Sequence, residues 1–192
     1  MTATNITGIL EFLRQAERLK NTIRSGHTSE GRQESVAEHT WRLCLMAMVF
    51  SKEFPDVDFE RLIKICIIHD LGEAIRGDIP APAQVGIESK ADQERADLLV
   101  LLAPLPESIR EEIEELWDDY VYAQSPEARL AKALDKLETI LQHNQGINPS
   151  NFDYRFNLEY GKKYTSYDPL IGAIRKILDQ ETGMHALSQE SP

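Results

Sequence analysis

The chain has 192 residues, of which 42% are hydrophobic and 28% are charged, and its formal net charge is −11 at pH 7. This length and composition are typical of a soluble globular protein with one sizeable core. Nucleic-acid polymers and anionic membrane surfaces bind proteins through dense positive charge, so the acidic balance disfavours both as partners.

The sequence contains no pattern typical of an exported or membrane-spanning protein. Cys44 and Cys66 lie in apolar helical runs and form no C-x-x-C pattern, so neither a disulfide framework nor a cysteine-based zinc site is predicted. No N-terminal run resembles a signal peptide, and no stretch of about 18 uncharged apolar residues could span a bilayer. We therefore expect a cytoplasmic protein without a membrane partner.

Apolar residues recur at helical spacing almost throughout the chain, and strand-like alternation is hard to find. The pattern predicts an all-α fold, a bundle of about six or seven helices in a single domain over residues 1–192. In chain order, we expect helices at residues 5–21, 35–54, 58–75, 88–103, 106–122, 126–144 and 168–182.

The segments between these helices differ from them in composition. Residues 22–34, 76–87 and 145–167 hold much of the Gly, Pro, Asn and Ser, so we expect them to connect helices. The core should span about residues 5–182, and the polar tail at 183–192 should be flexible.

The first candidate site residue is His39, in the helix predicted at 35–54. Ser35 and Glu38 form a capping-box pattern at the start of this helix. Positions 39, 43 and 46 share one stripe, so His39 lies in line with Leu43 and Met46 and should face inward. An inward histidine is most often a hydrogen-bonded core residue, so His39 alone does not indicate a site.

The stretch KICIIHDLGEAIRGDIP, at residues 64–80, places charges at the end of a very apolar helix. A helix that is apolar all round is normally buried, so His69, Asp70 and Glu73 should be buried too. A carboxylate in a low-dielectric interior is costly unless it is paired, hydrogen-bonded or bound to a metal. One imidazole and two carboxylates therefore converge on a small region where something must compensate them.

Asp135 is a further candidate, in the stretch RLAKALDKLETILQH. It lies off the leucine stripe of its helix, and read alone it is more typical of a solvated surface acid. With His39, His69 and Asp70 it would form a mixed imidazole and carboxylate set. Such a set suits first-row cations such as Mn, Fe, Co, Ni or Zn, whereas an all-oxygen cage would suit Ca or Mg.

The order of His39, then HD at 69–70, then a distant Asp135 resembles the H…HD…D signature of the HD-domain metal-dependent phosphohydrolases. More narrowly, ESVAEHTWRL, HDLGEAIRGDIP and ALDKLE resemble the YfbR-like 5′-deoxynucleotidase branch, over roughly residues 8 to 145. The resemblance implies an HD domain that binds one divalent transition metal ion, Co, Mn, Fe, Ni or Zn, with Mg also possible. The ligands it implies are His39, His69, Asp70 and Asp135.

The same resemblance implies roles for three more residues. Glu73 looks like the acid/base residue, Asp78 like a partner that orients water or substrate, and Arg24 like the arginine that grips the phosphate. Without the resemblance, Glu73 could be a helix-end acid paired with Arg76, Asp78 could be a turn residue, and Arg24 could be an exposed loop arginine. The family often has an aromatic residue directly after this arginine, near the nucleoside. This chain has Ser25 there, which leaves its sugar and base preference open.

The resemblance implies a homodimeric phosphomonoesterase that hydrolyses deoxyribonucleoside 5′-monophosphates to deoxynucleoside and phosphate. Its partner would be this small nucleoside monophosphate substrate. An HD phosphohydrolase of another branch, acting on a nucleoside triphosphate, a cyclic nucleotide or an alarmone, would need a longer basic path than Arg24, Arg32 and Lys20 offer. A non-catalytic nucleotide or metal sensor would not need the proton relay that Glu73 and Asp78 suggest.

Overall fold

A computed structural model describes residues 2–79 and 90–190 of the chain, and it is all-α apart from one short strand pair. The elements in chain order are α1 (Ala3–Ala16), η1 (Glu17–Lys20), β1 (Ile23–His27), β2 (Gln33–Ser35), α2 (Val36–Phe50), η2 (Ser51–Glu53), α3 (Phe59–Ile68), α4 (Glu73–Arg76), α5 (Lys90–Leu102), α6 (Glu107–Tyr122), α7 (Pro126–Gln145), α8 (Tyr154–Glu159), α9 (Lys162–Thr165) and α10 (Pro169–Glu190). The predicted fold class is confirmed.

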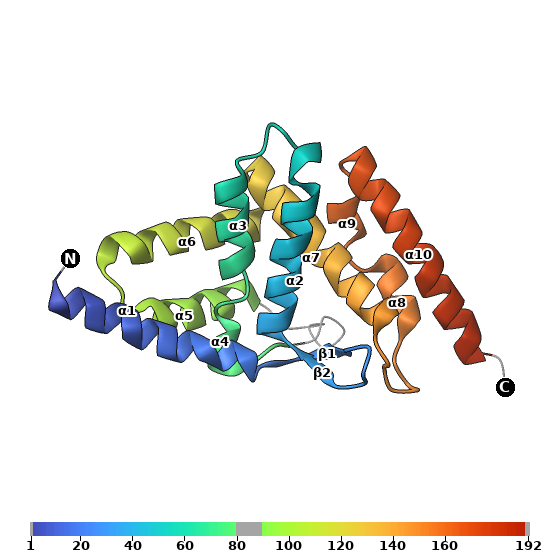
Figure 1. The fold of residues 1–192 in the computed structure, drawn as a ribbon, viewed down its shortest axis with the longest axis horizontal. Coiled ribbons are helices and arrows are strands. Elements are labelled where there is room, and N and C mark those ends of the chain that lie inside the picture. Colours follow the sequence, from blue (N-terminus) through green and yellow to red (C-terminus); the bar gives the residue numbers. More distant parts are fainter. Residues whose placement is uncertain (1, 80–89, 191–192) are drawn as a thin grey trace.

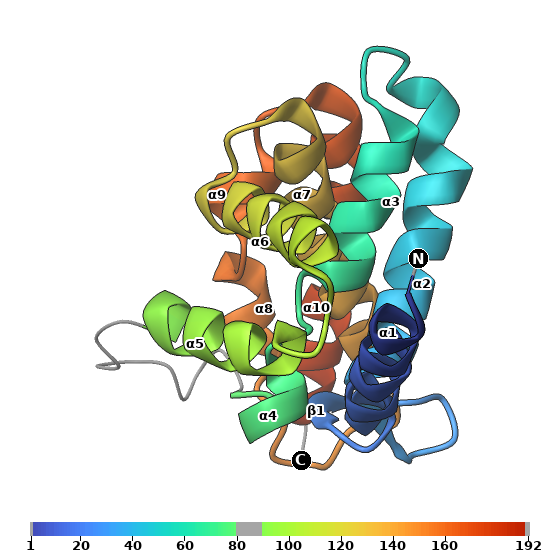
Figure 2. The same cartoon turned by 90° about the vertical axis from the view of Figure 1, so that its left-hand side faces the viewer.

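Helices α2, α3 and α7 form the centre of the molecule (Figure 1) and pack against one another. Helices α1, α5 and α6 lie on one side of this centre, and α8, α9 and α10 lie on the other. Figure 2 shows the same layers from the side of α5 and α6. Helix α7 contacts α6 on one side and α9 and α10 on the other, so it is the element shared by both groups.

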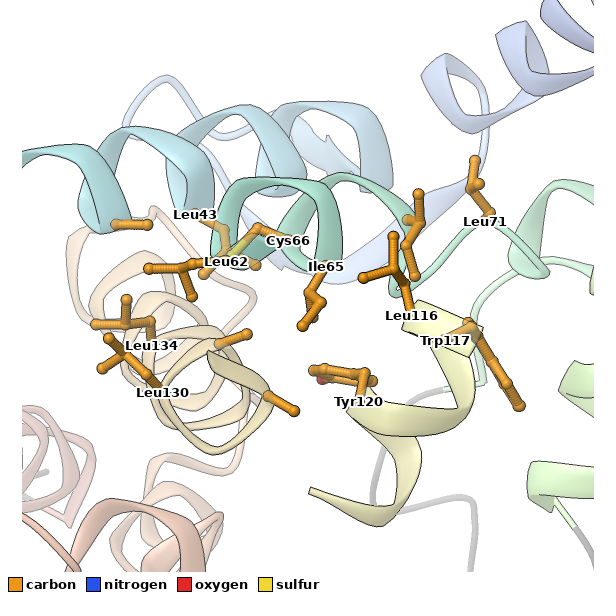
Figure 3. Close-up of a cluster of buried hydrophobic side chains, with 14 of the residues drawn as sticks. Leu43, Leu62, Ile65, Cys66, Leu71, Leu116, Trp117, Tyr120, Leu130 and Leu134 are labelled. Atoms are coloured by element: carbon orange, nitrogen blue, oxygen red, sulfur yellow. The ribbon is translucent and has the colours of Figure 1, made fainter. Parts of the chain in front are cut away.

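The core between these helices is apolar. Leu43 of α2, Ile65 of α3 and Leu134 of α7 are completely buried, and Trp117 and Tyr120 of α6 complete the cluster in Figure 3. Full burial of one such aliphatic side chain stabilises the fold by about 1.5–3 kcal/mol. The three central helices are therefore fixed against one another, which fixes the polar side chains that they carry at one end.

The helix expected at 58–75 is two helices, so this prediction was wrong. Helix α3 ends at Ile68, and a turn over residues 69–72 leads into α4. A Cβ atom on Gly72 would lie 2.7 Å from the carbonyl oxygen of Glu94 in α5, so the missing side chain lets α5 pack directly on the turn. The turn places His69 and Asp70 at the end of a helix, where their side chains can reach both α2 and α7.

Two segments expected to be connections contain regular structure. In 22–34, β1 and β2 pair antiparallel, with Ile23 opposite Ser35 and His27 opposite Gln33. In 145–167, α8 and α9 form. Both pieces are too short to show a hydrophobic period, so the sequence pattern did not indicate them.

The tail expected to be flexible from residue 183 is helical as far as Glu190, because its residues pack on the body of the protein. Ala186 is buried, the His185 ring stacks on Tyr154, and Gln189 donates to the carbonyl oxygens of Ser150 and Phe152. Residues 80–89, which include most of the connection expected at 76–87 and the start of the helix expected at 88–103, lie outside the described residues. That the whole chain forms one domain stays a prediction.

Candidate active site

The structure brings together the four residues that were predicted as metal ligands. His39 of α2 is completely buried, and its Nε2 lies 3.3 Å from Oδ1 of Asp135 in α7 and 3.9 Å from Oδ2 of Asp70. Nε2 of His69 lies 3.0 Å from the same Asp70 oxygen, and the centres of the two imidazole rings are 5.5 Å apart. We call His39, His69, Asp70 and Asp135 the ligand cluster.

The ligand cluster has the chemistry of a cation site. Nε2 of His39 and Nε2 of His69 are buried and have no hydrogen-bond partner among the described residues. Buried polar atoms are normally hydrogen-bonded, so two such nitrogens aimed at the same carboxylates indicate a missing positive partner. His39, His69 and Asp70 each offer an atom within 4.8 Å of the others. Two imidazole nitrogens and two carboxylates fit a divalent first-row cation.

The second ring nitrogen of each histidine is held by a protein group. Nδ1 of His69 lies 2.8 Å from the carbonyl oxygen of Cys66. Nδ1 of His39 is hydrogen-bonded to the completely buried carboxylate of Glu138, whose other oxygen accepts from Nε of Arg42 at 2.6 Å. Because Nδ1 is occupied in both rings, Nε2 is the atom presented to the ligand cluster.

The electrostatics of the ligand cluster favour a bound positive charge. Burial would raise the pKa of both Asp70 and Asp135. His69 nevertheless holds the pKa of the Asp70 carboxyl well below its usual range. Lys136 and His39 do the same for the pKa of the Asp135 carboxyl. Burial and Arg24 lower the pKa of His39, yet the carboxylates of Glu138 and Asp135 outweigh them and raise it to about 9. Both aspartates are therefore ionised at neutral pH, as metal ligands must be, and His39 would release the proton on Nε2 to bind a cation.

Asp135 is only 3% exposed, so it is not the solvated acid that its position off the leucine stripe suggested. Its Oδ2 accepts a hydrogen bond from the Tyr120 hydroxyl at 2.6 Å and lies 2.8 Å from Nζ of Lys136. Its Oδ1 is left to face His39. Tyr120 and Lys136 thus orient the carboxylate toward the ligand cluster, and sequence reasoning did not identify either as doing so.

Arg24 lies beside the ligand cluster because the β1–β2 pair carries it there. Its guanidinium NH1 is 3.4 Å from Oδ2 of Asp70, its NH2 donates to the Thr139 hydroxyl at 3.0 Å, and its Nε is 3.5 Å from the Glu34 carboxylate. The side chain is only 13% exposed, so the alternative of an exposed loop arginine is wrong.

Glu73 and Asp78 line the same cavity as Arg24, His69 and Asp70. Glu73 is buried at the start of α4, and Asp78 follows the end of that helix. Arg76, the alternative partner considered for Glu73, pairs instead with Asp97 at 3.0 Å. The structure therefore brings all seven predicted site residues to one place, while their individual roles stay predictions.

The cavity has a volume of about 910 Å³ and extends from the ligand cluster to α8 and α9. The sequence analysis did not identify the residues on the side of the cavity away from the ligand cluster. The stretch FNLEYGKKYT there, at residues 156–165, is nevertheless rich in aromatic and basic residues. The cavity-lining side chains that were missed there are Phe156, Tyr160, Lys162, Lys163 and Tyr164.

Comparison with known proteins finds similar sequences over most of the chain. The family model described as HD domain matches residues 16–175. The chain is 35% identical to the human 5′-deoxynucleotidase HDDC2 over 139 residues, which covers 71% of this chain and 67% of the relative. It is 34% identical to the Danio rerio protein of the same name over 183 residues, which covers 92% and 89% of the two chains. The 5′-deoxynucleotidase hdd1 of Schizosaccharomyces pombe is 36% identical over 148 residues, or 74% of each chain.

The fold also matches solved structures. A crystal structure described as a predicted metal-dependent phosphohydrolase from Magnetospirillum magnetotacticum superimposes with a TM-score of 0.81 over 98% of this chain and 100% of the other, at 22% sequence identity. At that identity, the match supports the fold alone. Among the described residues, no helix combines the length and apolar character needed to cross a membrane.

Proposed function

Because the chain belongs to the HD-domain family, we propose that it is a metal-dependent phosphomonoesterase that hydrolyses deoxyribonucleoside 5′-monophosphates to deoxynucleoside and phosphate. The proposal rests on one observation above all: two buried imidazole nitrogens and the Asp70 carboxylate lie within 4.8 Å of one another, with Asp135 beside His39 and the largely buried Arg24 beside Asp70. The relatives named 5′-deoxynucleotidases, which match over most of the chain, support this substrate class.

His39, His69, Asp70 and Asp135 would hold one divalent ion, with Co, Mn, Fe, Ni or Zn suiting this donor set. The ion would supply positive charge to a phosphoryl oxygen and activate the attacking water. The protein would fix the four ligands through Glu138, the Cys66 carbonyl, Tyr120 and Lys136.

Arg24 is placed to bind the phosphate oxygens. Burial lowers the pKa of its guanidinium, but the charges of Asp70 and Asp135 raise this pKa by more than burial lowers it, so the group stays charged. A guanidinium can donate two parallel hydrogen bonds to a phosphate, and the Thr139 hydroxyl and Glu34 carboxylate hold this one in orientation. Arg24 would neutralise phosphate charge and align the phosphorus for attack.

Glu73 and Asp78 supply the proton chemistry in this proposal. Glu73 would donate a proton to the departing 5′ oxygen of the sugar, because an alkoxide is a poor leaving group. Asp78 would orient the attacking water or the substrate. Both residues line the cavity beside the ligand cluster, as these roles require.

The basic groups next to the ligand cluster favour a monophosphate over a longer phosphate chain. Arg32 pairs with Glu38 at 2.6 Å and does not extend the basic path. Of the cavity lysines nearest the ligand cluster, Lys132 donates to two backbone carbonyls and Lys136 binds Asp135, so neither offers a ready second phosphate site. On the far side of the cavity, Lys162 pairs with Glu159 at 2.6 Å, and Lys163 lies 4.6 Å from the centre of the Tyr164 ring.

We also propose that the chain forms a homodimer. Helix α2 exposes Trp41, Met48 and Val49 by 66%, 53% and 63%, with Leu45 on the same stripe. Clustered exposed apolar side chains of this kind mark interaction surfaces. Sedimentation of the full chain tests this, and a monomer at micromolar concentration would contradict it. A cytoplasmic location stays a prediction.

The decisive experiment measures phosphate release from 5′-dNMPs, 5′-NMPs, a 3′-dNMP and dGTP. Metal-stripped protein is reconstituted with Mn, Co, Zn or Mg, with EDTA as a control. We expect metal-dependent release confined to 5′-monophosphates. If metal binds with a defined stoichiometry and no monophosphate reacts, the proposed substrate class is wrong.

The variant Glu73→Ala separates an enzyme from a non-catalytic sensor. Metal binding should survive while hydrolysis falls at least about tenfold, given typical acid/base contributions. Glu111→Ala, an exposed glutamate on α6, is the matched control. Unchanged turnover in Glu73→Ala would remove Glu73 from the mechanism.

A further inference from the structure

The cavity continues beyond the ligand cluster to a surface formed by α8, the turn at Gly161 and α9. Phe156, Tyr160 and Tyr164 line the cavity there and are partly buried, and we call these three residues the aromatic wall. The ring centres of Phe156 and Tyr160 are 5.7 Å apart, with their planes tilted by 34°. A partly exposed aromatic ring that lines a cavity can stack on a planar ligand group.

The aromatic wall borders the ligand cluster directly. Nζ of Lys136 lies 2.8 Å from Oδ2 of Asp135 and 5.1 Å from the centre of the Tyr160 ring. One lysine ammonium therefore separates the cation site from the first ring of the wall. A group attached to a phosphate held at the ligand cluster would reach this surface.

The wall is built before any ligand arrives. Arg175 of α10 is 5% exposed and donates to the carbonyl oxygens of Tyr160 at 2.6 Å, Asn157 at 2.8 Å and Leu158 at 2.9 Å. Its Nε donates to Asp179 at 2.7 Å. These bonds fix the end of α8 to α10, and a surface fixed in advance loses little conformational entropy when it binds.

The side of the cavity that carries Arg24 differs from the aromatic wall. Arg24 is followed by Ser25, which lines the cavity but presents only a hydroxyl. A nucleoside whose phosphate is held by Arg24 therefore finds no aromatic ring next to that arginine in the chain. Of the other described rings that line the cavity, Trp117 is 2% exposed, and Phe152 packs edge-on against His143 and Tyr154. We therefore take the three rings of the aromatic wall as the group that packs against a base.

We propose that the nucleoside part of the substrate packs against the aromatic wall, with Phe156 and Tyr160 as its main contacts. This inference rests on the proposed function, since it names the part of the site that distinguishes a nucleotide from a simple phosphate ester. Stacking accepts every base because each base has a π face. The site therefore selects for the presence of a base more than for its identity.

Two measurements test the inference. Calorimetry measures the binding of deoxyadenosine and thymidine, which carry no phosphate, to the metal-reconstituted full chain. Steady-state kinetics compares kcat/KM for a 5′-dNMP with kcat/KM for deoxyribose 5-phosphate, which has no base. The variants are Phe156→Ala, Phe156→Leu and Phe156→Tyr, with Tyr122→Ala as the control because Tyr122 is 66% exposed on α6.

Phe156→Ala should weaken deoxynucleoside binding by about five- to 140-fold, the range expected when one stacked ring is removed. It should lower the ratio of the two kcat/KM values by a similar factor, while Phe156→Tyr and Tyr122→Ala resemble the wild type. If Phe156→Ala lowers the melting temperature, Phe156→Leu, which keeps apolar volume without a ring, should show the same loss of nucleoside binding.

Unchanged deoxynucleoside affinity in both ring-removing variants would overturn the inference, as would an equal loss of activity on both esters. The proposed function fails separately, when the wild type releases phosphate from no monophosphate. Calorimetry would still decide the role of the wall in that case, because it requires no turnover.

Discussion

The ligand cluster and the aromatic wall border one cavity but are built in different ways. The cluster is carried by the long helices α2 and α7 and by the turn that follows α3, and its histidines are almost completely buried. The wall sits on α8 and α9, which have six and four residues, and its rings are only partly buried. The cluster owes its geometry to the core beneath it, whereas the wall is fixed by contacts of α8 and α9 with α7 and α10, among them the hydrogen bonds of Arg175.

This difference suggests that the two regions have separate functions. Groups that hold a cation must be placed accurately and kept from water, and a packed core provides both. A surface that receives different bases needs shape and ring area more than accurate polar contacts. Changes in the cluster should therefore alter metal binding and chemistry, while changes in the wall should alter nucleoside binding. The four variants below test that separation, from the largest expected effect to the smallest.

Asp135→Asn tests the cluster most strongly. The amide keeps the shape of the carboxylate but removes the negative charge that faces His39 and Lys136. We expect metal content to fall and phosphate release to drop by at least about a hundredfold, because the ion contributes several kcal/mol to the barrier. Deoxynucleoside binding should persist. Asp56→Asn, in an exposed loop, is the control; full metal content and activity in Asp135→Asn would rule Asp135 out as a ligand.

Glu138→Gln tests how the cluster is held in place. Glutamine cannot supply the charge that binds both the His39 ring and the Arg42 guanidinium. Loss of such a partner of a metal-bound histidine typically costs about 10–100-fold in metal affinity, and we expect that range here. Metal titration of the stripped protein measures it, with the exposed Glu111→Gln as control. An affinity equal to that of the wild type would show that His39 needs no carboxylate partner.

Arg175→Met tests what holds the wall. Methionine preserves part of the side-chain volume but leaves the carbonyl oxygens at the end of α8 without their donor. We expect a loss of about 2 kcal/mol of stability and a weaker affinity for deoxynucleoside, with metal affinity retained. Thermal unfolding and calorimetry measure the two effects, and Lys176→Met on the exposed face of α10 is the control. An equal loss of metal affinity would contradict the separate roles that we assign to the cluster and the wall.

Gly161→Ala should have the smallest effect. Gly161 has a φ of 69°, and a Cβ there would lie 2.7 Å from the Lys136 side chain. We expect a loss of about 1 kcal/mol, because an alanine in this conformation is strained. Gly172→Ala in α10 should instead be neutral or slightly stabilising, since nothing lies within 4 Å of its added Cβ. Chemical denaturation of both variants compares them, and equal shifts would contradict the argument.

The sequence predicted the two regions unequally for a physical reason. His39 and His69 could be placed inward because helical periodicity shows which face of a helix is buried. Asp135 could not, because α7 is buried on nearly every side, so position relative to a leucine stripe does not separate buried from exposed residues there. Only the family resemblance pointed to it, and the structure places it in the cluster.

The wall could not be predicted from local pattern at all. Helices α8 and α9 are shorter than the window in which a period becomes visible. Their position depends on Arg175, which is 15 residues beyond Tyr160 in the chain and looks like any helical arginine in the sequence. The break after α3 was missed for a similar reason, since it depends on the approach of α5 to Gly72.

Helix α7 sets the register of both regions, and this has a consequence for insertions and deletions. Asp135, Lys136, Glu138 and Thr139 all project from it toward their partners in the cavity floor. One residue added between Pro126 and Asp135 would turn them all by about 100° around the helix axis, because an α-helix has 3.6 residues per turn. An insertion or deletion of one residue in this part of α7 should therefore abolish activity.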